Sequence, residues 1–489
     1  MNGHYLAGSA PGYGEQSGGD YLQLAWNYWL PGHQLEHGRA PWKDPYSFQP
    51  ESPQRPNLQG WLLGTPFWPV ERALGPAWAY DFVLLLTFLA AGGFTCWWLR
   101  SLGLPRGPAL LGGVVFVLAP YRLQQSTGHL LGQISFLLPA MLLALERRRI
   151  VLATLALAAI PLSGQVHLAL GAIPLFVAYA WLRLPPWRQR LYAFAGAACA
   201  IAAGELVQHI VIATSILAGG RSLGSVSFYS ATLADFVTRS NDNGVERFVF
   251  LGWVTPLVAL FGLAVVWRSG RRRLAVFLAL MALVPILLAL GTHFPGYSTL
   301  WHHFKPLRYP RVPERLLPIA CLALAALVAF AATRLRHAAL VALLAVGLAA
   351  DLHVTIFGAP KAYTDDPAYA AIREPGRLLE LPIFRPDIDL GSTYLAYAMQ
   401  SPRERPGGYS TTAAQTSDGW AKRHRSLTCG EGEVPRYVRY VAVHRGVYRR
   451  ANYMDDRCPA AAEAVLRRQG FHVLARSGPI TIWQAPWPP

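Results

Sequence analysis

Apolar runs long enough to cross a lipid bilayer recur along most of this sequence, between residues 77 and 357. A spanning helix needs about 17–25 mainly apolar residues, and a helix satisfies all its backbone hydrogen bonds within one segment. Only 15% of the 489 residues are charged, against about 25% in an average soluble protein. The chain is therefore predicted to be a mainly α membrane protein, built as a multi-span transmembrane helix bundle.

Ten candidate spans divide this bundle, which occupies residues 77–357. They cover residues 77–99, 108–123, 129–146, 150–163, 165–183, 191–217, 248–268, 273–291, 315–334 and 338–357. Arginines gather between alternate spans, as the positive-inside rule expects of cytoplasmic loops. The clearest clusters are Arg147–Arg149, Arg183/Arg188/Arg190, Arg268/Arg271–Arg273 and Arg334/Arg336. Because the basic residues mark topology in this way, the net charge of +17 does not indicate nucleic-acid binding.

The charge alternation places both ends of the chain outside the cytoplasm. Residues 1–76 are rich in proline and aromatic residues, and they are predicted to form a first outer loop with interfacial helices, the first from about Tyr21 to His37. Residues 358–489 are predicted to form a small extracytoplasmic α/β domain. Its strands are expected at 377–381 and 437–444, its helix at 460–469, and a hairpin at 471–475 with 480–484. An outer N-terminus also leads us to expect a further apolar helix, preceded by Lys or Arg, encoded upstream of Met1.

One carboxylate stands out in the first loop. Asp20 follows Gly18 and Gly19 and precedes a segment with an aromatic face that includes Tyr21 and Trp29. Glycines let the backbone approach a ligand closely, and Trp and Tyr favour the membrane–water interface. The stretch is compatible with chemistry on a lipid-borne substrate and equally with a turn that caps an interfacial helix.

Basic residues near the outer ends of the spans form a second set of candidates. Arg308, Arg311 and Arg315 lie at the predicted start of a helix, where forked guanidinium groups form either a phosphate site or an anchor at anionic headgroups. Arg122 and His129 face the same compartment and are compatible with anion binding or with snorkelling and capping. Glu205 and His209, four residues apart in a predicted span, are expected to face a bundle interior or cavity.

The cysteines and the absence of several motifs limit the kinds of cofactor and metal site that the sequence supports. Cys429 and Cys458 are the only cysteines of the C-terminal segment, and an even pair in an exported domain predicts a disulfide, the alternative being two buried free thiols. The sequence has no Walker loop, no His-Glu-x-x-His and no Cys-x-x-Cys. No cofactor or metal ligand set is therefore indicated, although dependence on a divalent metal stays open.

Several short motifs together resemble the GT-C superfamily of bacterial membrane glycosyltransferases, in particular a group with a C-terminal extracytoplasmic domain. They are Gly18-Gly-Asp20-Tyr-Leu-Gln-x-Ala-Trp-Asn27, Ala119-Pro-Tyr-Arg122 with Gly128-His129, Phe250-Leu-Gly-Trp253, Arg311-Val-Pro-Glu-Arg315 and Gly407-Gly-Tyr-Ser410. The resemblance implies that an acid of the first outer loop, here Asp20, acts as general base on an acceptor hydroxyl. It also implies a sugar on polyprenyl phosphate as donor.

The resulting hypothesis is an inverting glycosyltransferase of the bacterial inner membrane that acts on an extracytoplasmic glycan, lipid or protein acceptor. Arg308, Arg311, Arg315 and Arg122 are expected to bind the donor phosphate, while Tyr21, Trp26, Trp29 and His129 are expected to shape the acceptor and sugar groove. A transporter or flippase for lipid-linked glycans and a non-catalytic envelope assembly protein are the alternatives. A flippase requires broken helices with paired charges near the bilayer centre.

Overall fold

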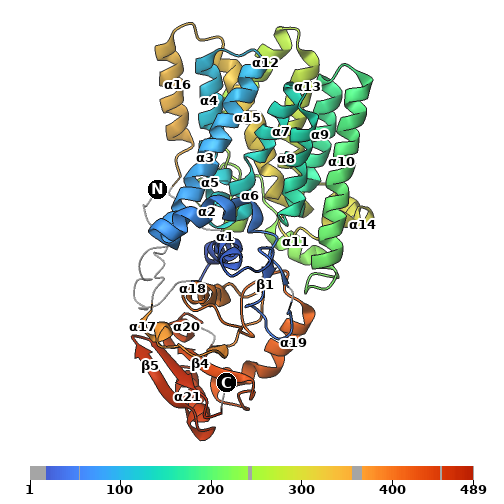
Figure 1. Cartoon of the computed structure of the whole chain (residues 1–489). Coiled ribbons are helices and arrows are strands. Elements are labelled where there is room, and N and C mark those ends of the chain that lie inside the picture. The colour runs from blue at the N-terminus through green and yellow to red at the C-terminus, as the bar shows by residue number, and fades with distance from the viewer. Residues whose placement is uncertain (1–17, 54, 241–244, 355–365, 452–453, 488–489) are drawn as a thin grey trace. The chain divides into compact units, whose positions relative to one another are not determined.

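The computed structural model describes residues 18–53, 55–240, 245–354, 366–451 and 454–487 (Figure 1). The chain forms two compact units. One contains residues 1–83, 210–218 and 357–489, and the other contains residues 84–209 and 219–356. The first unit thus combines the N-terminal segment with the C-terminal segment, although more than 270 residues separate them in the sequence.

The second unit is helical. Its helices are α4 (Arg106–Leu118), α5 (Pro120–Gly128), α6 (Leu130–Ile134), α7 (Leu137–Glu146), α8 (Ile150–Leu162), α9 (Val166–Arg183), α10 (Trp187–Val207), α11 (Leu223–Tyr229), α12 (Val254–Arg268), α13 (Arg272–Ala289), α14 (Tyr297–His303), α15 (Leu317–Ala332) and α16 (Ala338–Asp351). Helix α3 (Pro76–Ser101) begins in the first unit and continues into the second. Short helical turns join them: η2 (Val245–Arg247), η3 (Gly291–His293), η4 (Lys305–Arg308) and η5 (Pro313–Leu316). The turn η1 (Gln208–Ile212) follows α10 and continues into the first unit.

Each of the ten predicted spans coincides with helical structure. Within the described residues, five helical segments are long and apolar enough to cross a membrane: Pro76–Ser101, Val166–Arg183, Trp187–Ile212, Arg272–Ala289 and Pro313–Ala332. Five further apolar helices have 10–17 residues. One cause of shortening is visible at Pro120, which begins α5 directly after α4 ends, because proline starts a helix readily but breaks one that is already running. The count of ten spans stays a prediction.

Helix α15 is the centre of the second unit. It contacts α4, α12 and α13 (Figure 1). The apolar stretch within Pro313–Ala332, which includes most of α15, is 94% buried inside the protein, against 22% for that of Trp187–Ile212, which contains α10. A helix that is apolar on every side has to be enclosed by others. Glycine lets the helices approach, since a Cβ at Gly262 of α12 would lie 1.9 Å from the carbonyl oxygen of Leu327.

The N-terminal part of the first unit is built around α1 (Asp20–Glu36), close to the predicted helix at Tyr21–His37. It contacts α2 (Trp61–Leu74) and α18 (Ser392–Gln400). Two-residue strands β1 (Lys43–Asp44) and β2 (Arg55–Pro56) pair antiparallel between the helices. Gly60, the residue before α2, packs against α1. A Cβ at this position would lie 1.9 Å from the carbonyl oxygen of Asn27, so only glycine allows the start of α2 to approach α1 this closely.

The C-terminal part contains one four-stranded sheet with the order β3-β4-β6-β5. Its strands are β3 (Arg377–Leu381), β4 (Val438–His444), β5 (His472–Ser477) and β6 (Ile480–Gln484). Strands β3 and β4 are parallel, whereas β4/β6 and β5/β6 are antiparallel. The strands lie where the sequence predicts them, and so does α21 (Cys458–Arg468) (Figure 1). The other helices here are α17 (Pro367–Ala370), α19 (Gln415–His424) and α20 (Arg445–Arg450), with the turns η6 (Asp389–Gly391) and η7 (Arg425–Cys429).

Strand β4 is buried on both of its faces, which explains its nearly continuous apolar run. Val441 and Val443 pack into a core with Trp483 and the helix α21, while Tyr440 and Ala442 pack into a second core that contains Tyr369. Alternate residues of a strand point to opposite faces. A strand buried in this way needs apolar side chains at both parities.

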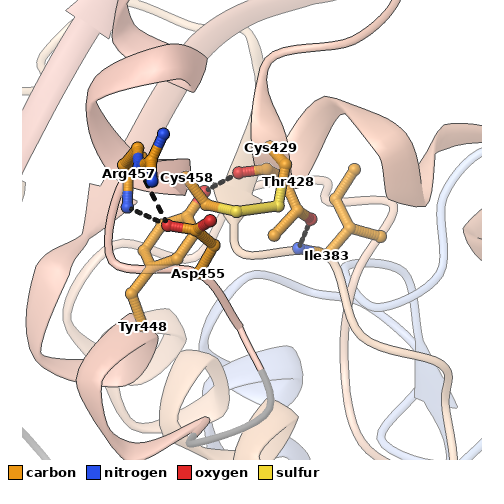
Figure 2. The surroundings of a disulfide bond; sticks show 7 residues. All are labelled: Ile383, Thr428, Cys429, Tyr448, Asp455, Arg457 and Cys458. Atoms are coloured by element: carbon orange, nitrogen blue, oxygen red, sulfur yellow. Dashed lines mark hydrogen bonds and ion pairs between the residues drawn. A yellow bond between two sulfur atoms is a disulfide. The ribbon is translucent and has the colours of Figure 1, made fainter.

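A disulfide joins Cys429 at the end of η7 to Cys458 at the start of α21 (Figure 2). The sulfur atoms are 1.99 Å apart and the Cα atoms 4.0 Å apart. Thr428 beside it accepts a hydrogen bond from the amide of Ile383 through its hydroxyl, and one from the Tyr448 hydroxyl through its carbonyl oxygen. The bridge therefore ties α21 to the loop that follows α19, next to the end of β3.

Candidate functional site

Asp20 is the first residue of α1 and is half-buried. A carboxylate is favourable there because the helix macrodipole is positive at its N-terminus. The preceding Gly19 has a φ of 159°, and a Cβ at this position would lie 2.5 Å from the ring of Tyr21. The Gly-Gly-Asp sequence therefore presents the carboxylate at a helix start that a larger residue at position 19 would disturb.

The C-terminal segment supplies the residues that hold this carboxylate. Tyr409 donates a hydrogen bond from its hydroxyl to Asp20 Oδ1 at 2.5 Å. Gln23, one turn further along α1, donates from Nε2 to the carbonyl oxygen of Tyr409 at 2.9 Å. The amide of Gly19 donates to Ser392 Oγ at 2.8 Å. Two stretches singled out separately in the sequence, Gly18–Asn27 and Gly407–Ser410, are thus neighbours in one unit.

A buried ion pair fixes the loop that carries Tyr409. Arg405 and Glu380 both have fully buried side chains and pair through Nη1 and Oε1. Burial raises the pKa of the Glu380 carboxyl, and the Arg405 charge opposes this. The backbone of Arg405 also donates to the carbonyl oxygen of Tyr46 and accepts from the amide of Gln49, both at 2.8 Å. Breaking such a pair by removing one charge is expensive, so the loop position is well determined.

The aromatic residues predicted to line a sugar groove are buried in the first unit. Tyr21, Trp26 and Trp29 have exposed fractions of 4%, 1% and 7%. The rings of Trp26 and Trp29 stack at 5.1 Å, and Trp29 stacks on His33 at 4.1 Å. Packing occupies these rings, so we assign them to the core beneath Asp20 and do not retain their predicted sugar-stacking role.

Two of the predicted phosphate-binding arginines meet at one carboxylate in the second unit. Arg311 Nη2 lies 3.3 Å from Glu246 Oε1, and Arg315 Nη2 lies 3.0 and 3.2 Å from the two oxygens of Glu246. The guanidinium of Arg311 also stacks over the ring of Tyr229 at 4.4 Å. The two guanidinium groups therefore converge on one anionic group, although Arg311 lies in the irregular segment before η5 and only Arg315 lies within that turn.

Arg308 does not join this pair. Its Nη2 donates to the carbonyl oxygen of His302 at 2.6 Å and its Nε to that of Trp301 at 3.3 Å, while the guanidinium lies 5.3 Å from the Trp301 ring. These contacts close the turn between α14 and η4. The structure therefore gives Arg308 a bracing role in this loop.

Arg122 and His129 also have structural partners. Arg122 is fully buried, donates from Nε to Ser135 Oγ at 2.8 Å, and lies between the rings of Phe88 and Phe116 at 4.9 and 5.2 Å. His129 hydrogen-bonds Gln125 at 2.6 Å where α5 ends and α6 begins. Full burial removes Arg122 as a phosphate ligand, whereas His129 is half-buried and its place in the sugar groove stays a prediction.

Glu205 and His209 are exposed on α10 and η1, contrary to the expected interior position. The apolar helix that carries them is only lightly enclosed, so its charged residues remain outside the bundle. Glu205 and His209 therefore do not supply the paired charges within the bundle that a flippase requires.

Sequence reasoning missed three residues of these clusters. Tyr409 was noted only as part of a motif, and Glu246 lies in a loop with no periodic signal. Glu314 is fully buried between Arg311 and Arg315, and no hydrogen bond to its carboxylate oxygens is found among the described residues. The available signal was that Glu314 is the only acidic residue between Glu246 and Asp351 in the sequence, because a carboxylate is expensive to bury in a membrane protein. The described residues contain no group of three or more His, Cys, Asp or Glu side chains arranged for a metal ion.

Comparisons with known proteins connect this chain to solved structures only. No protein-family model matches it, and no curated protein matches its sequence. The structure of the arabinofuranosyltransferase AftD from Mycobacteria aligns with a TM-score of 0.58 and 16% identity over 97% of this chain. This chain spans only 38% of the length of AftD.

A second solved protein, ArnT from Cupriavidus metallidurans, matches along nearly its whole length. Its apo structure aligns with a TM-score of 0.51 and 12% identity, over 99% of this chain and 94% of ArnT. Its complex with undecaprenyl phosphate aligns with a TM-score of 0.50 and 13% identity, over 98% and 94%. At these identities the likeness concerns the fold.

Proposed function

Since the chain has the fold of the GT-C superfamily of membrane glycosyltransferases, we propose that it transfers a sugar from a polyprenyl-phosphate donor to an extracytoplasmic acceptor. The observation that carries this proposal is the half-buried Asp20 at the start of α1, held by the hydroxyl of Tyr409. An acid that is positioned but still partly exposed suits a general base. The complex of ArnT with undecaprenyl phosphate supports a lipid phosphate as the carrier.

Asp20 is proposed to accept the proton of the acceptor hydroxyl as that oxygen attacks the anomeric carbon. The bond between this carbon and the phosphate oxygen breaks in the same step, and the lipid phosphate leaves with the bonding electrons. A single displacement inverts the anomeric configuration. General-base assistance of this kind contributes roughly 10²–10⁴-fold in rate.

Arg311 and Arg315 are proposed to hold the phosphate of the donor. Paired guanidinium groups match the oxygens of a phosphate and stabilise the charge that develops as it leaves. Glu246 already engages both arginines, so the phosphate has to replace or share this carboxylate. Glu246 thereby stands in for the anion while no donor is bound.

One assay tests both assignments. The purified full chain is supplied with a panel of radiolabelled polyprenyl-phosphate sugars, and sugar release and product formation are followed. Asp20→Asn keeps the shape of the side chain and removes the base, so transfer should fall by roughly 10²–10⁴-fold. Asp456→Asn, an exposed acid of the same unit, is the matched control and should transfer at the wild-type rate.

The arginine assignment has a separate readout in this assay. Arg311→Ala should raise the donor concentration needed for half-maximal transfer, because it removes one of the two guanidinium groups from the phosphate. Transfer retained by a correctly inserted Asp20→Asn protein would refute the base. An unchanged donor dependence in Arg311→Ala would remove that arginine from the donor site.

A further inference from the structure

A cavity of about 570 Å³ opens at one end of the helical unit, within the size range of ligand pockets. Its lining comes from the turn after α3, the end of α9 and the turn between α12 and α13. The lining residues are Leu102, Leu182, Arg183, Gly270, Arg271, Arg272, Arg273 and Leu274. Four of these described residues are arginines and none is acidic, so the cavity is built for an anion.

Two of the arginines are already engaged in the wall. Arg271 donates from Nη1 to the carbonyl oxygen of Leu102 at 2.8 Å and so ties the α12–α13 turn to the end of α3. Arg183 pairs with Glu146 through two hydrogen bonds of 2.5 and 3.0 Å. The Glu146 carboxylate compensates the charge of Arg183 but leaves the other three arginines uncompensated.

Arg272 and Arg273 are exposed at the start of α13, and no acidic side chain pairs with either among the described residues. Arg272 lies 5.7 Å from the ring of Trp267. Cations in the first turn of a helix oppose its macrodipole, and the three consecutive arginines also repel one another. The positive-inside rule explains basic residues at this end of the bundle, but it does not explain a cavity between them.

The surroundings place the cavity at headgroup depth. Trp181 directly precedes the lining residue Leu182, and Trp267 lies three residues before Gly270. These two tryptophans are 59% and 48% exposed. Exposed tryptophans mark the membrane–water interface. Along α13, the exposed side chains beyond the cavity are apolar, including Leu280 and Leu283. An amphipathic molecule bound here would have its charged part among arginines and its apolar part along the helix surface.

We propose that this cavity binds the phosphate headgroup of an anionic membrane phospholipid. Arg272 and Arg273 donate to the phosphate oxygens, for which the planar guanidinium fork is suited. Leu182 and Leu274 contact the apolar part of the lipid below the headgroup. The site lies wholly within the helical unit and does not depend on the proposed transfer reaction.

The test uses the full chain in nanodiscs of phosphatidylcholine, alone or mixed with phosphatidylglycerol. Retained lipid is measured by native mass spectrometry, and the thermal unfolding midpoint is recorded in each bilayer. A basic residue near an anionic headgroup contributes about 5-fold in affinity, so Arg272→Gln with Arg273→Gln should weaken retention of phosphatidylglycerol about 30-fold. Arg334→Gln with Arg336→Gln removes the same charge from exposed positions outside the cavity and should retain the lipid like the wild type.

The outcomes separate the possible sources of the phosphate. Phosphatidylglycerol should raise the unfolding midpoint of the wild type and of the control pair, and phosphatidylcholine alone should not. Equal retention of phosphatidylglycerol by all three proteins would overturn the proposal. Equal protection by soluble glycerol 3-phosphate at the same concentration would overturn the assignment to a lipid. If the double variant does not insert, Arg273→Gln alone should weaken retention about 5-fold.

Discussion

Replacing Tyr409 with phenylalanine removes one hydroxyl from the surroundings of Asp20 and leaves the aromatic ring in place. The hydroxyl lies 2.5 Å from Asp20 Oδ1, and the Tyr409 side chain is buried to 93%. A hydrogen bond to a charged group contributes about 1.5–3 kcal/mol to stability. Because Asp20 is only half-buried, water takes over part of this interaction, and we expect a value at the lower end of that range.

A double-mutant cycle isolates this energy from the rest of the packing. The full chain is unfolded with denaturant as wild type, Asp20→Asn, Tyr409→Phe and the double variant, and the coupling should be about 1.5 kcal/mol. In the transfer assay, loss of the hydroxyl removes one of the contacts that orient the carboxylate toward the acceptor. The rate of Tyr409→Phe should fall about 10-fold, because misplacement of a reacting group is costly.

A matched variant separates catalysis from stability. The Tyr448 hydroxyl donates to the carbonyl oxygen of Thr428 at 2.7 Å in the same unit (Figure 2). Tyr448→Phe should lose about 0.5–1.5 kcal/mol of stability and keep the wild-type transfer rate. The positioning role of Tyr409 is refuted if Tyr409→Phe transfers as fast as the wild type, or if Tyr448→Phe slows transfer equally.

Three further predictions follow from other contacts. Replacing both Cys429 and Cys458 with serine removes the disulfide, which links positions 29 residues apart. The free energy of unfolding should fall by about 3.5 kcal/mol, and an unchanged denaturant midpoint would contradict this. Burial, and next the charge of His37, lower the pKa of His33 to about 4. As the pH falls, His33 is protonated in the unfolded chain before it is protonated in the folded protein. The free energy of unfolding should therefore decrease as the pH drops from about 6.5 to 4. If His33→Gln shows the same dependence of stability on pH, another group is responsible. Glu246→Gln should bind polyprenyl phosphate more tightly in a direct binding assay, because the phosphate no longer competes with a carboxylate, and weaker binding would argue against the stand-in role.

Local patterns in the sequence were sufficient for the elements themselves. The helix at Asp20–Glu36, the four strands of the sheet and α21 all lie where periodicity, strand propensity and turn residues predicted them. The pairing of Cys429 with Cys458 could be anticipated for a similar reason, because only two cysteines lie in that segment. These signals depend on neighbours within a few residues or on simple counting.

The sequence could not give the environment of each charged side chain. Arg122 and Arg311 look alike as interfacial arginines, yet one is enclosed by Phe88 and Phe116 and the other faces Glu246. Whether a guanidinium is free for a ligand depends on which carbonyls, rings and carboxylates the packed helices bring to it. Such contacts join positions tens of residues apart, and no local pattern records them.

The difference between local and long-range contacts also applies to Asp20. The glycines before Asp20 and the aromatic face after it are local, so the sequence alone identified this carboxylate as a candidate. That Tyr409 holds it was decided by the tertiary structure, because the two residues are 389 positions apart. Their contact exists only because the α1 segment and the C-terminal segment fold into one compact unit, anchored by the buried pair of Arg405 and Glu380.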